Sequence, residues 1–125
     1  MFSRKVLIVE DDQDLQELYA TILKKAKIKT LLAKNGNEAV TIALEEHPDA
    51  ILMDVMLPDI SGHDAVKKIR LDDWGKKAVV IFLTNRSDAG SIVKAIQAGS
   101  EDYIIKSQTT NEELLNKVRS AMMSK

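Results

Sequence analysis

The stretch Asp49-Ala-Ile-Leu-Met-Asp54-Val-Met-Leu-Pro58-Asp-Ile-Ser-Gly62 decides the fold of this chain. Residues 50–53 are apolar without polar alternation, which is typical of a parallel strand that is covered on both faces. Asp54 follows at once, and a charged side chain belongs at the exit of such a strand, where open parallel sheets place their ligands. A proline and a glycine then mark a turn, and Ser61 can cap the next helix.

Short apolar blocks and amphipathic stretches alternate along the rest of the chain. The other strands are expected at residues 6–9, 30–33, 78–84 and 102–105. Helices are expected at residues 15–27, 39–46, 61–71 and 87–98, and after a capping box made by Thr110 and Glu113. Asn37 is a plausible cap for the second helix. This (βα)5 order predicts an α/β fold with a doubly wound parallel sheet, because crossovers between parallel strands are right-handed.

Polar residues stand at the ends of several expected strands. In the common strand order 2-1-3-4-5 the first and third strands are neighbours, which brings Glu10 and Asp11 beside Asp54. Three carboxylates would repel one another unless a cation joined them, and Mg²⁺ prefers oxygen ligands of this kind. Thr84 and Lys106 leave the fourth and fifth strands at the same edge. The three carboxylates, one Mg²⁺ and the Lys106 ammonium would sum to zero charge.

This combination of groups is suited to phosphoryl transfer, in which positioning and charge neutralisation supply most of the catalysis. Carboxylates can attack phosphorus to give an aspartyl phosphate. Asp54 is the candidate nucleophile because it stands alone at its turn, whereas Glu10 and Asp11 form a metal clamp.

Composition limits the other functions. The 125 residues suffice for one domain, residues 1–125, with one core. The net charge of −1 and the scattered cations do not favour direct nucleic-acid binding. Cysteine is absent, which excludes disulfides and thiolate metal sites. No apolar run has membrane length and no signal peptide is recognisable, so we expect no membrane partner and a cytoplasmic location.

The strand-end residues resemble those of the bacterial response-regulator receiver domain of two-component signalling, and the resemblance covers essentially the whole chain. It implies a flavodoxin-like fold and a Mg²⁺ ion held partly by the backbone carbonyl of Met56. It implies that Glu10 and Asp11 form the family's acidic pair and that Asp54 is its phosphoryl acceptor. It also implies that Thr84 is the switch hydroxyl, that Tyr103 is the switch aromatic and that Lys106 is the family's lysine.

The resemblance further implies that a histidine kinase or phosphotransfer protein donates a phosphoryl group to Asp54. The domain would catalyse its own phosphorylation and autodephosphorylation and would not be a metabolic enzyme. Its output would be a changed face, formed by the fourth helix, fifth strand and fifth helix, that binds a downstream protein. If no output domain follows Lys125 in the full protein, we expect the effect to pass to another protein, from a monomer or a weak phosphorylation-dependent dimer.

Two departures from the family pattern lie beside the expected site. The family usually has a proline, joined by a cis bond, directly after the lysine, where this chain has Ser107. The family usually has a small residue after the switch hydroxyl, whereas Asn85 and Arg86 are larger. We hypothesise that these two side chains slow the entry of small phosphodonors or water, so that the acyl phosphate is long-lived.

The sequence supports three other functions less well. A pseudo-receiver, which is a protein-interaction module that is never phosphorylated, is supported by Ser107 and opposed by the complete set of site residues. A flavin or nucleotide binder of flavodoxin type would need a phosphate loop after the first strand, where Glu10 and the two following aspartates would repel phosphate. A metal-dependent phosphatase would carry an Asp-x-Asp pattern at one strand end, and that pattern is missing there.

Overall fold

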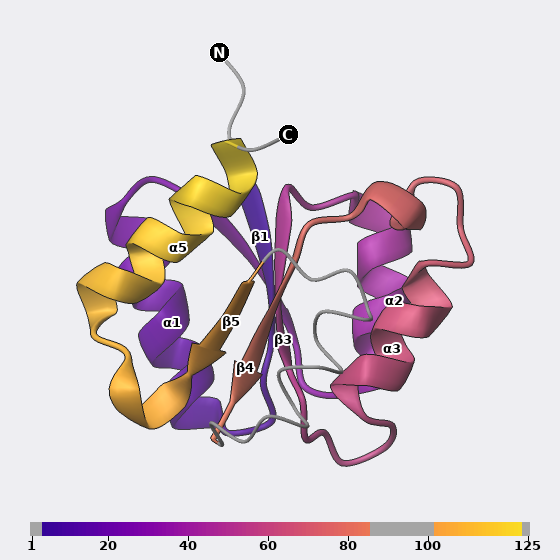
Figure 1. The fold of residues 1–125 in the computed structure, drawn as a ribbon, viewed down its shortest axis with the longest axis horizontal. Helices are drawn as coiled ribbons and strands as arrows, with labels where there is room; N and C mark the ends of the chain where they lie inside the picture. The colour runs from indigo at the N-terminus through magenta and orange to yellow at the C-terminus, as the bar shows by residue number, and fades with distance from the viewer. Residues whose placement is uncertain (1–3, 86–101, 124–125) are drawn as a thin grey trace.

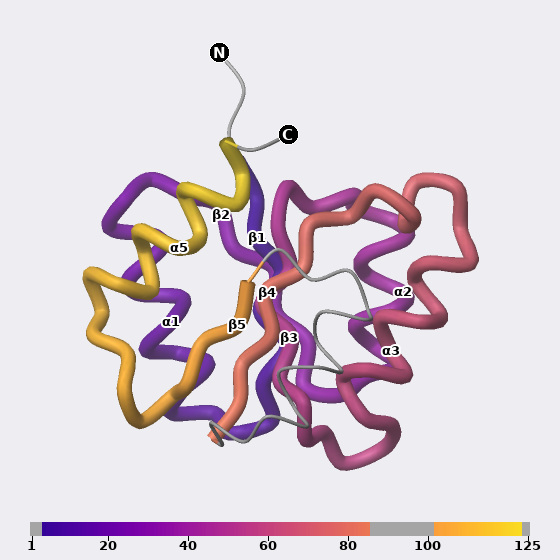
Figure 2. The backbone as a smooth tube through the Cα atoms, viewed as in Figure 1, coloured from indigo at the N-terminus to yellow at the C-terminus, as the bar shows by residue number. Residues whose placement is uncertain are grey.

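In the computed structural model of the chain, five parallel strands form one sheet in the order β2-β1-β3-β4-β5. Figure 1 shows this sheet, and Figure 2 labels β2 beside β1. The structure describes residues 4–85 and 102–123. The strands are β1 Lys5–Val9, β2 Lys29–Ala33, β3 Ala50–Asp54, β4 Val80–Thr84 and β5 Asp102–Ile105. This topology confirms the doubly wound α/β fold that the order of the apolar blocks predicts.

Four α-helices within the described residues cover the two faces of the sheet. They are α1 Gln13–Lys25, α2 Gly36–Glu46, α3 Gly62–Ile69 and α5 Asn111–Met123. Helices α1 and α5 lie together on one face, and α2 and α3 lie together on the other, so that the sheet runs between two helical layers (Figures 1 and 2). The helix expected at residues 87–98 falls outside the described part of the chain. None of the described helices combines the length and apolar character that a membrane span requires.

The sheet has a hydrophobic core on each face. Alternate residues of a strand point to opposite faces, so Val6 of β1 joins a buried cluster with Val118 of α5, while Leu7 joins a different cluster with Val66 of α3. Strands β3 and β4 are buried at every position. Burial on both faces explains why these strands are continuous apolar blocks in the sequence.

The N-terminal cap of α2 differs from the one expected. Asn35, not Asn37, caps the helix, because its side chain accepts a hydrogen bond from the backbone N–H of Glu38 at 2.8 Å. The helix therefore begins at Gly36, three residues before the expected start at Ala39. By contrast, the caps predicted at Ser61 and at Thr110 with Glu113 are confirmed.

Two other boundaries are also shifted. Helix α1 begins at Gln13 and ends at Lys25, and Lys27 lies beyond it with a left-handed φ of 63°. The expected strand at residues 78–84 begins only at Val80, because Ala78 ends a short 3-10 helix, Gly75–Lys77. The side chain of Arg70 holds this turn through hydrogen bonds from Nη1 to the carbonyl oxygens of Gly75 and Ala78.

Candidate functional site

The register of the central strands determines where the acidic residues lie. Val9 of β1 pairs with Met53 of β3, so that Glu10 and Asp54, the next residue of each chain segment, stand at neighbouring strand ends. The backbone N–H of Glu10 also donates a hydrogen bond to the carbonyl of Ala33 at the end of β2. Both acids are thus placed by strand pairing at the carboxyl edge of the sheet, where open parallel sheets bind their ligands.

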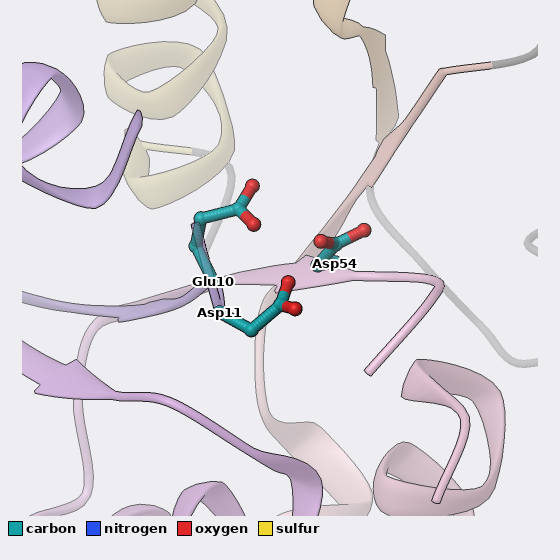
Figure 3. A group of neighbouring side chains, drawn as sticks. All are labelled: Glu10, Asp11 and Asp54. Carbon is teal, nitrogen blue, oxygen red and sulfur yellow. The ribbon is translucent and has the colours of Figure 1, made fainter. Parts of the chain in front are cut away.

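Glu10, Asp11 and Asp54 form one carboxylate cluster. Each offers an oxygen, and these three oxygens all lie within 4.8 Å of one another. Figure 3 shows Glu10 and Asp11 extending from the end of β1, with Asp54 facing them from the end of β3. Glu10 and Asp54 are buried, whereas Asp11 is exposed. A hard cation that takes a few carboxylate oxygens and keeps water on its open side fits this donor set, as Mg²⁺ does in proteins.

Lys106 adds a positive charge to the cluster. Its Nζ lies 2.5 Å from Oε1 of Glu10 and 2.9 Å from Oδ2 of Asp54. The exposed fractions of the three side chains are 8% for Lys106, 1% for Glu10 and 6% for Asp54. One ammonium beside three carboxylates leaves two negative charges, which a single divalent cation would neutralise.

Burial and pairing act in opposite directions on the ionisation of these groups. Burial raises the pKa of the Glu10 carboxyl, although hydrogen bonds from Lys106 and from the backbone N–H of Asp12 partly offset it. Burial alone would lower the pKa of Lys106, but its hydrogen bonds to Glu10 and Asp54 outweigh that effect, and the pKa is raised. Lys106 is therefore held as an ammonium ion.

The turn after Asp54 folds back closely on the strand end. The backbone N–H of Met56 donates to Oδ1 of Asp54 at 3.2 Å, and the N–H of Gly62 donates to the carbonyl of Val55 at 2.8 Å. A Cβ atom on Gly62 would lie 2.1 Å from the carbonyl oxygen of Asp54, so only glycine fits there. Met56 as a whole is 73% exposed, and its contact with the cluster is made by its backbone N–H.

Thr84 and Tyr103, the expected switch residues, lie on the neighbouring strands. Thr84 is buried at the end of β4, one residue beyond the position that pairs with Asp54. Tyr103 of β5 is half-buried and packs against the apolar cluster on the α2 and α3 face. Lys117 of α5 lies over its ring, with Nζ 5.9 Å from the ring centroid, and forms an ion pair with Asp102.

The structure also describes the two loops where the sequence departs from the family pattern. Ser107 lies in a 3-10 helix, Lys106–Gln108, and no peptide bond within the described residues is cis. Asn85 is exposed directly after the buried Thr84, while Arg86 falls outside the described residues.

Sequence reasoning missed Asp59, which follows the proline of the turn. The sequence shows it only as part of that turn, yet its carboxylate accepts hydrogen bonds from two backbone N–H groups of α2. A lone aspartate after proline signals a turn residue, and nothing local indicates a partner more than twenty positions away.

The chain matches the family model described as the response regulator receiver domain over residues 6–119. A polar-differentiation response regulator of Brucella ovis, DivK, is 34% identical over 104 residues, which are 83% of this chain and 85% of DivK. The DNA-binding response regulator MtrA of Mycobacterium tuberculosis is 30% identical over 119 residues, which are 95% of this chain. The chain spans about half the length of MtrA, since the match covers 50% of it.

Solved structures show the same similarity. The receiver domain of a sensor histidine kinase from Pseudomonas aeruginosa, solved with a magnesium ion coordinated in its active site cleft, is 30% identical with a TM-score of 0.89. The match covers 98% of this chain and 99% of that one. A response regulator structure from Chloroflexus aurantiacus is 29% identical with a TM-score of 0.91, at the same two coverages.

Proposed function

The chain belongs to the response regulator receiver domain family of two-component signalling, and we propose that it accepts a phosphoryl group on Asp54. Mg²⁺ would be held by Glu10, Asp11 and Asp54 together with the backbone carbonyl of Met56. The observation that carries this proposal is the buried Asp54 carboxylate, 2.9 Å from the Lys106 ammonium and within 4.8 Å of two further carboxylates.

The transfer follows from these groups. An oxygen of Asp54 would attack the phosphorus of a phosphohistidine, the P–N bond would break, and the imidazole would leave and take up a proton from solvent. Lys106, already bonded to Asp54, is positioned to pair with a phosphoryl oxygen as negative charge accumulates there. Mg²⁺, when bound, would neutralise charge on the other phosphoryl oxygens. The donor would be a histidine kinase or a histidine phosphotransfer protein.

The output would be a change in a protein-binding surface. A phosphoryl group on Asp54 offers new acceptor oxygens close to the end of β4, so Thr84 would move towards it and Tyr103 would follow. The affected face would comprise β5, α5 and the helix expected at residues 87–98, and it would bind a downstream protein. We propose that residues 1–125 form one receiver domain.

Intact mass spectrometry tests the acceptor. The protein would be incubated with acetyl phosphate and Mg²⁺, and wild type should gain the mass of one phosphoryl group. Asp54→Asn should gain none, and neither should wild type with the metal removed by chelation. Asp64→Asn, which changes an exposed acid in the first turn of α3, is the matched control and should react as wild type does. A wild-type protein without mass gain would contradict the proposal and favour a pseudo-receiver.

A further inference from the structure

The loop that follows Asp54 is tied to the start of α2. Oδ1 of Asp59 accepts a hydrogen bond from the backbone N–H of Gly36, and Oδ2 accepts one from the N–H of Asn37, each at 2.8 Å. The side chain of Asn35 accepts the hydrogen bond from the N–H of Glu38. Asp59 therefore supplies the acceptors for the two N–H groups that precede it, the first two of the helix. A carboxylate in this place also interacts favourably with the positive end of the helix dipole.

The contact between loop and helix is close as well as charged. A Cβ atom on Gly36 would lie 2.4 Å from Cγ1 of Ile60 and 3.4 Å from Oδ1 of Asp59, so glycine allows the two segments to touch. Desolvation raises the pKa of the Asp59 carboxyl, but the backbone N–H groups of Asn37 and Gly36 outweigh this and lower the pKa to about 2. Asp59 is therefore ionised at neutral pH, the form that makes both hydrogen bonds.

The same loop carries a proposed metal ligand. Its first residues are fixed to the sheet, since the N–H of Val55 donates to the carbonyl of Leu83 at 3.0 Å and that of Met56 donates to Asp54. Asp59 anchors the loop three residues further on. Met56 lies between these two anchors in the sequence, and we expect both of them to constrain the direction of its backbone carbonyl.

We propose that Asp59 is a positioning residue for the metal site, because its carboxylate clamps the loop to α2 and so fixes the Met56 carbonyl beside the acidic cluster. This inference rests on the proposed metal site. It differs from a simple capping role, in which Asp59 stabilises α2 and leaves metal affinity unchanged. Thermodynamic linkage also requires the reverse effect, so that Mg²⁺ binding strengthens the Asp59 clamp.

The test is a Mg²⁺ titration of the full chain followed by NMR, using the metal alone as the probe. Asp59→Ala should weaken Mg²⁺ binding by about 10-fold, the lower end of the range for residues that orient metal ligands. Asp59→Asn, which retains one amide oxygen as acceptor, should fall between Asp59→Ala and wild type. Asp64→Asn removes the same charge from an exposed acid of α3 without touching the clamp, and should change affinity far less than Asp59→Ala.

Two measurements distinguish a positioning role of Asp59 from an effect of its charge and from an effect on folding. Gly36→Ala loosens the same contact from the helix side without altering charge, and it should also weaken Mg²⁺ binding. In the metal-free protein, amide hydrogen exchange over residues 56–60 should be faster in Asp59→Ala and in Gly36→Ala than in wild type. In wild type, Mg²⁺ should slow exchange of the Gly36 and Asn37 amides.

The outcomes that overturn the inference are distinct from failure of the proposed function. If wild type binds Mg²⁺ and Asp59→Ala binds it equally well, the positioning role is wrong while the metal site stands. If Asp59→Ala and Asp64→Asn weaken binding equally, the effect is one of charge and the clamp is again refuted. If wild type binds no Mg²⁺, both the proposed function and this inference are overturned.

Discussion

The ammonium of Lys106 and the carboxylate of Glu10, 96 positions apart in the chain, lie 2.5 Å from each other with both side chains almost fully buried. Removing two charges from water costs free energy that their attraction only partly repays, so a buried ion pair is weak support for stability. Its presence at the carboxyl edge of the sheet is better explained by the chemistry of the site than by folding.

The first prediction is that Glu10→Gln stabilises the metal-free protein at neutral pH. The pKa of Glu10 is raised above its ordinary value of 4.5. The contribution of this carboxyl to stability is therefore fully present below that value and is lost as pH rises through the raised pKa. Glutamine does not titrate, so the advantage of the variant should grow over the same pH window. Urea unfolding with chelator, from about pH 4 to pH 8, measures this difference.

Mg²⁺ provides the control for that prediction. It should raise the free energy of unfolding of wild type and have a smaller effect on Glu10→Gln, because the variant lacks one carboxylate of the proposed metal clamp. A variant that is less stable than wild type without metal, at every pH, would contradict the explanation.

A second prediction concerns the loss of the ammonium. Lys106→Met leaves two buried carboxylates without their cation, so the metal-free protein should lose about 3 kcal/mol of stability. Mg²⁺ should restore part of this loss by supplying the missing positive charge. Lys76→Met is the matched control, since the Lys76 pair with Asp73 is exposed and should contribute less than about 1 kcal/mol. Equal losses in the two variants would refute the prediction.

A third prediction is the ionisation of Asp59, followed through its carboxyl carbon by NMR. The pKa should be about 2, below the ordinary 3.8, because the N–H groups of α2 stabilise the carboxylate against the effect of desolvation. The stability that Asp59 contributes is present above its ordinary pKa and is lost as pH falls through about 2. The stability gap between wild type and Asp59→Asn should accordingly narrow in that window. A pKa at the ordinary value would argue that the two hydrogen bonds are absent in solution.

A fourth prediction uses the end of α2. His47 caps this helix with a left-handed φ of 48°, and its ring stacks on Trp74 with centroids 4.5 Å apart. Both His47→Ala and His47→Gly lose the stacking, but only alanine keeps the steric cost of the left-handed backbone. His47→Gly should therefore be the more stable of the two by about 1 kcal/mol. Fluorescence of Trp74, the one tryptophan of the chain, reports both unfolding and the loss of the stacked ring. Equal stability of the two variants would mean that the backbone there is not left-handed.

A fifth prediction tests the residues after the expected switch hydroxyl. If the side chains of Asn85 and Arg86 restrict access to Asp54, then Asn85→Ala and Arg86→Ala should each shorten the half-life of the phosphorylated protein. Mass spectrometry after removal of the phosphodonor gives that half-life directly. An unchanged half-life in both variants would show that neither side chain limits the entry of water.

Strands β3 and β4 could be recognised in the sequence because burial on both faces makes each of them a continuous apolar block, although β4 begins two residues later than expected. The gathering of Glu10, Asp11 and Asp54 could also be predicted, because the carboxyl ends of parallel strands meet at one edge. Strand order alone does not predict the ion pair between Lys106 and Glu10. That ion pair depends on how far the long lysine side chain reaches across the ends of β4 and β3, the two strands between β5 and β1.

The start of α2 shows why local patterns fail. Asn35 and Asn37 flank a glycine, and either asparagine could cap a helix. The choice is made by a distant residue, because Asp59 takes the N–H groups of Gly36 and Asn37 and allows the helix to begin one position after Asn35. The stacking of His47 on Trp74 is also a tertiary contact, and no periodicity in the sequence predicts it.

The pairing of Val9 with Met53 determines where the carboxylates of Glu10 and Asp54, the next residue of each segment, are placed. Deleting or inserting one residue within β1 would displace Glu10 by a step of about 3.3 Å and turn the strand's side chains to the opposite faces of the sheet. Loops that carry no residue of the site can change length without this penalty. Evolution or engineering could therefore remodel those loops, whereas the spacing of the acids can change only if the sheet itself is rebuilt.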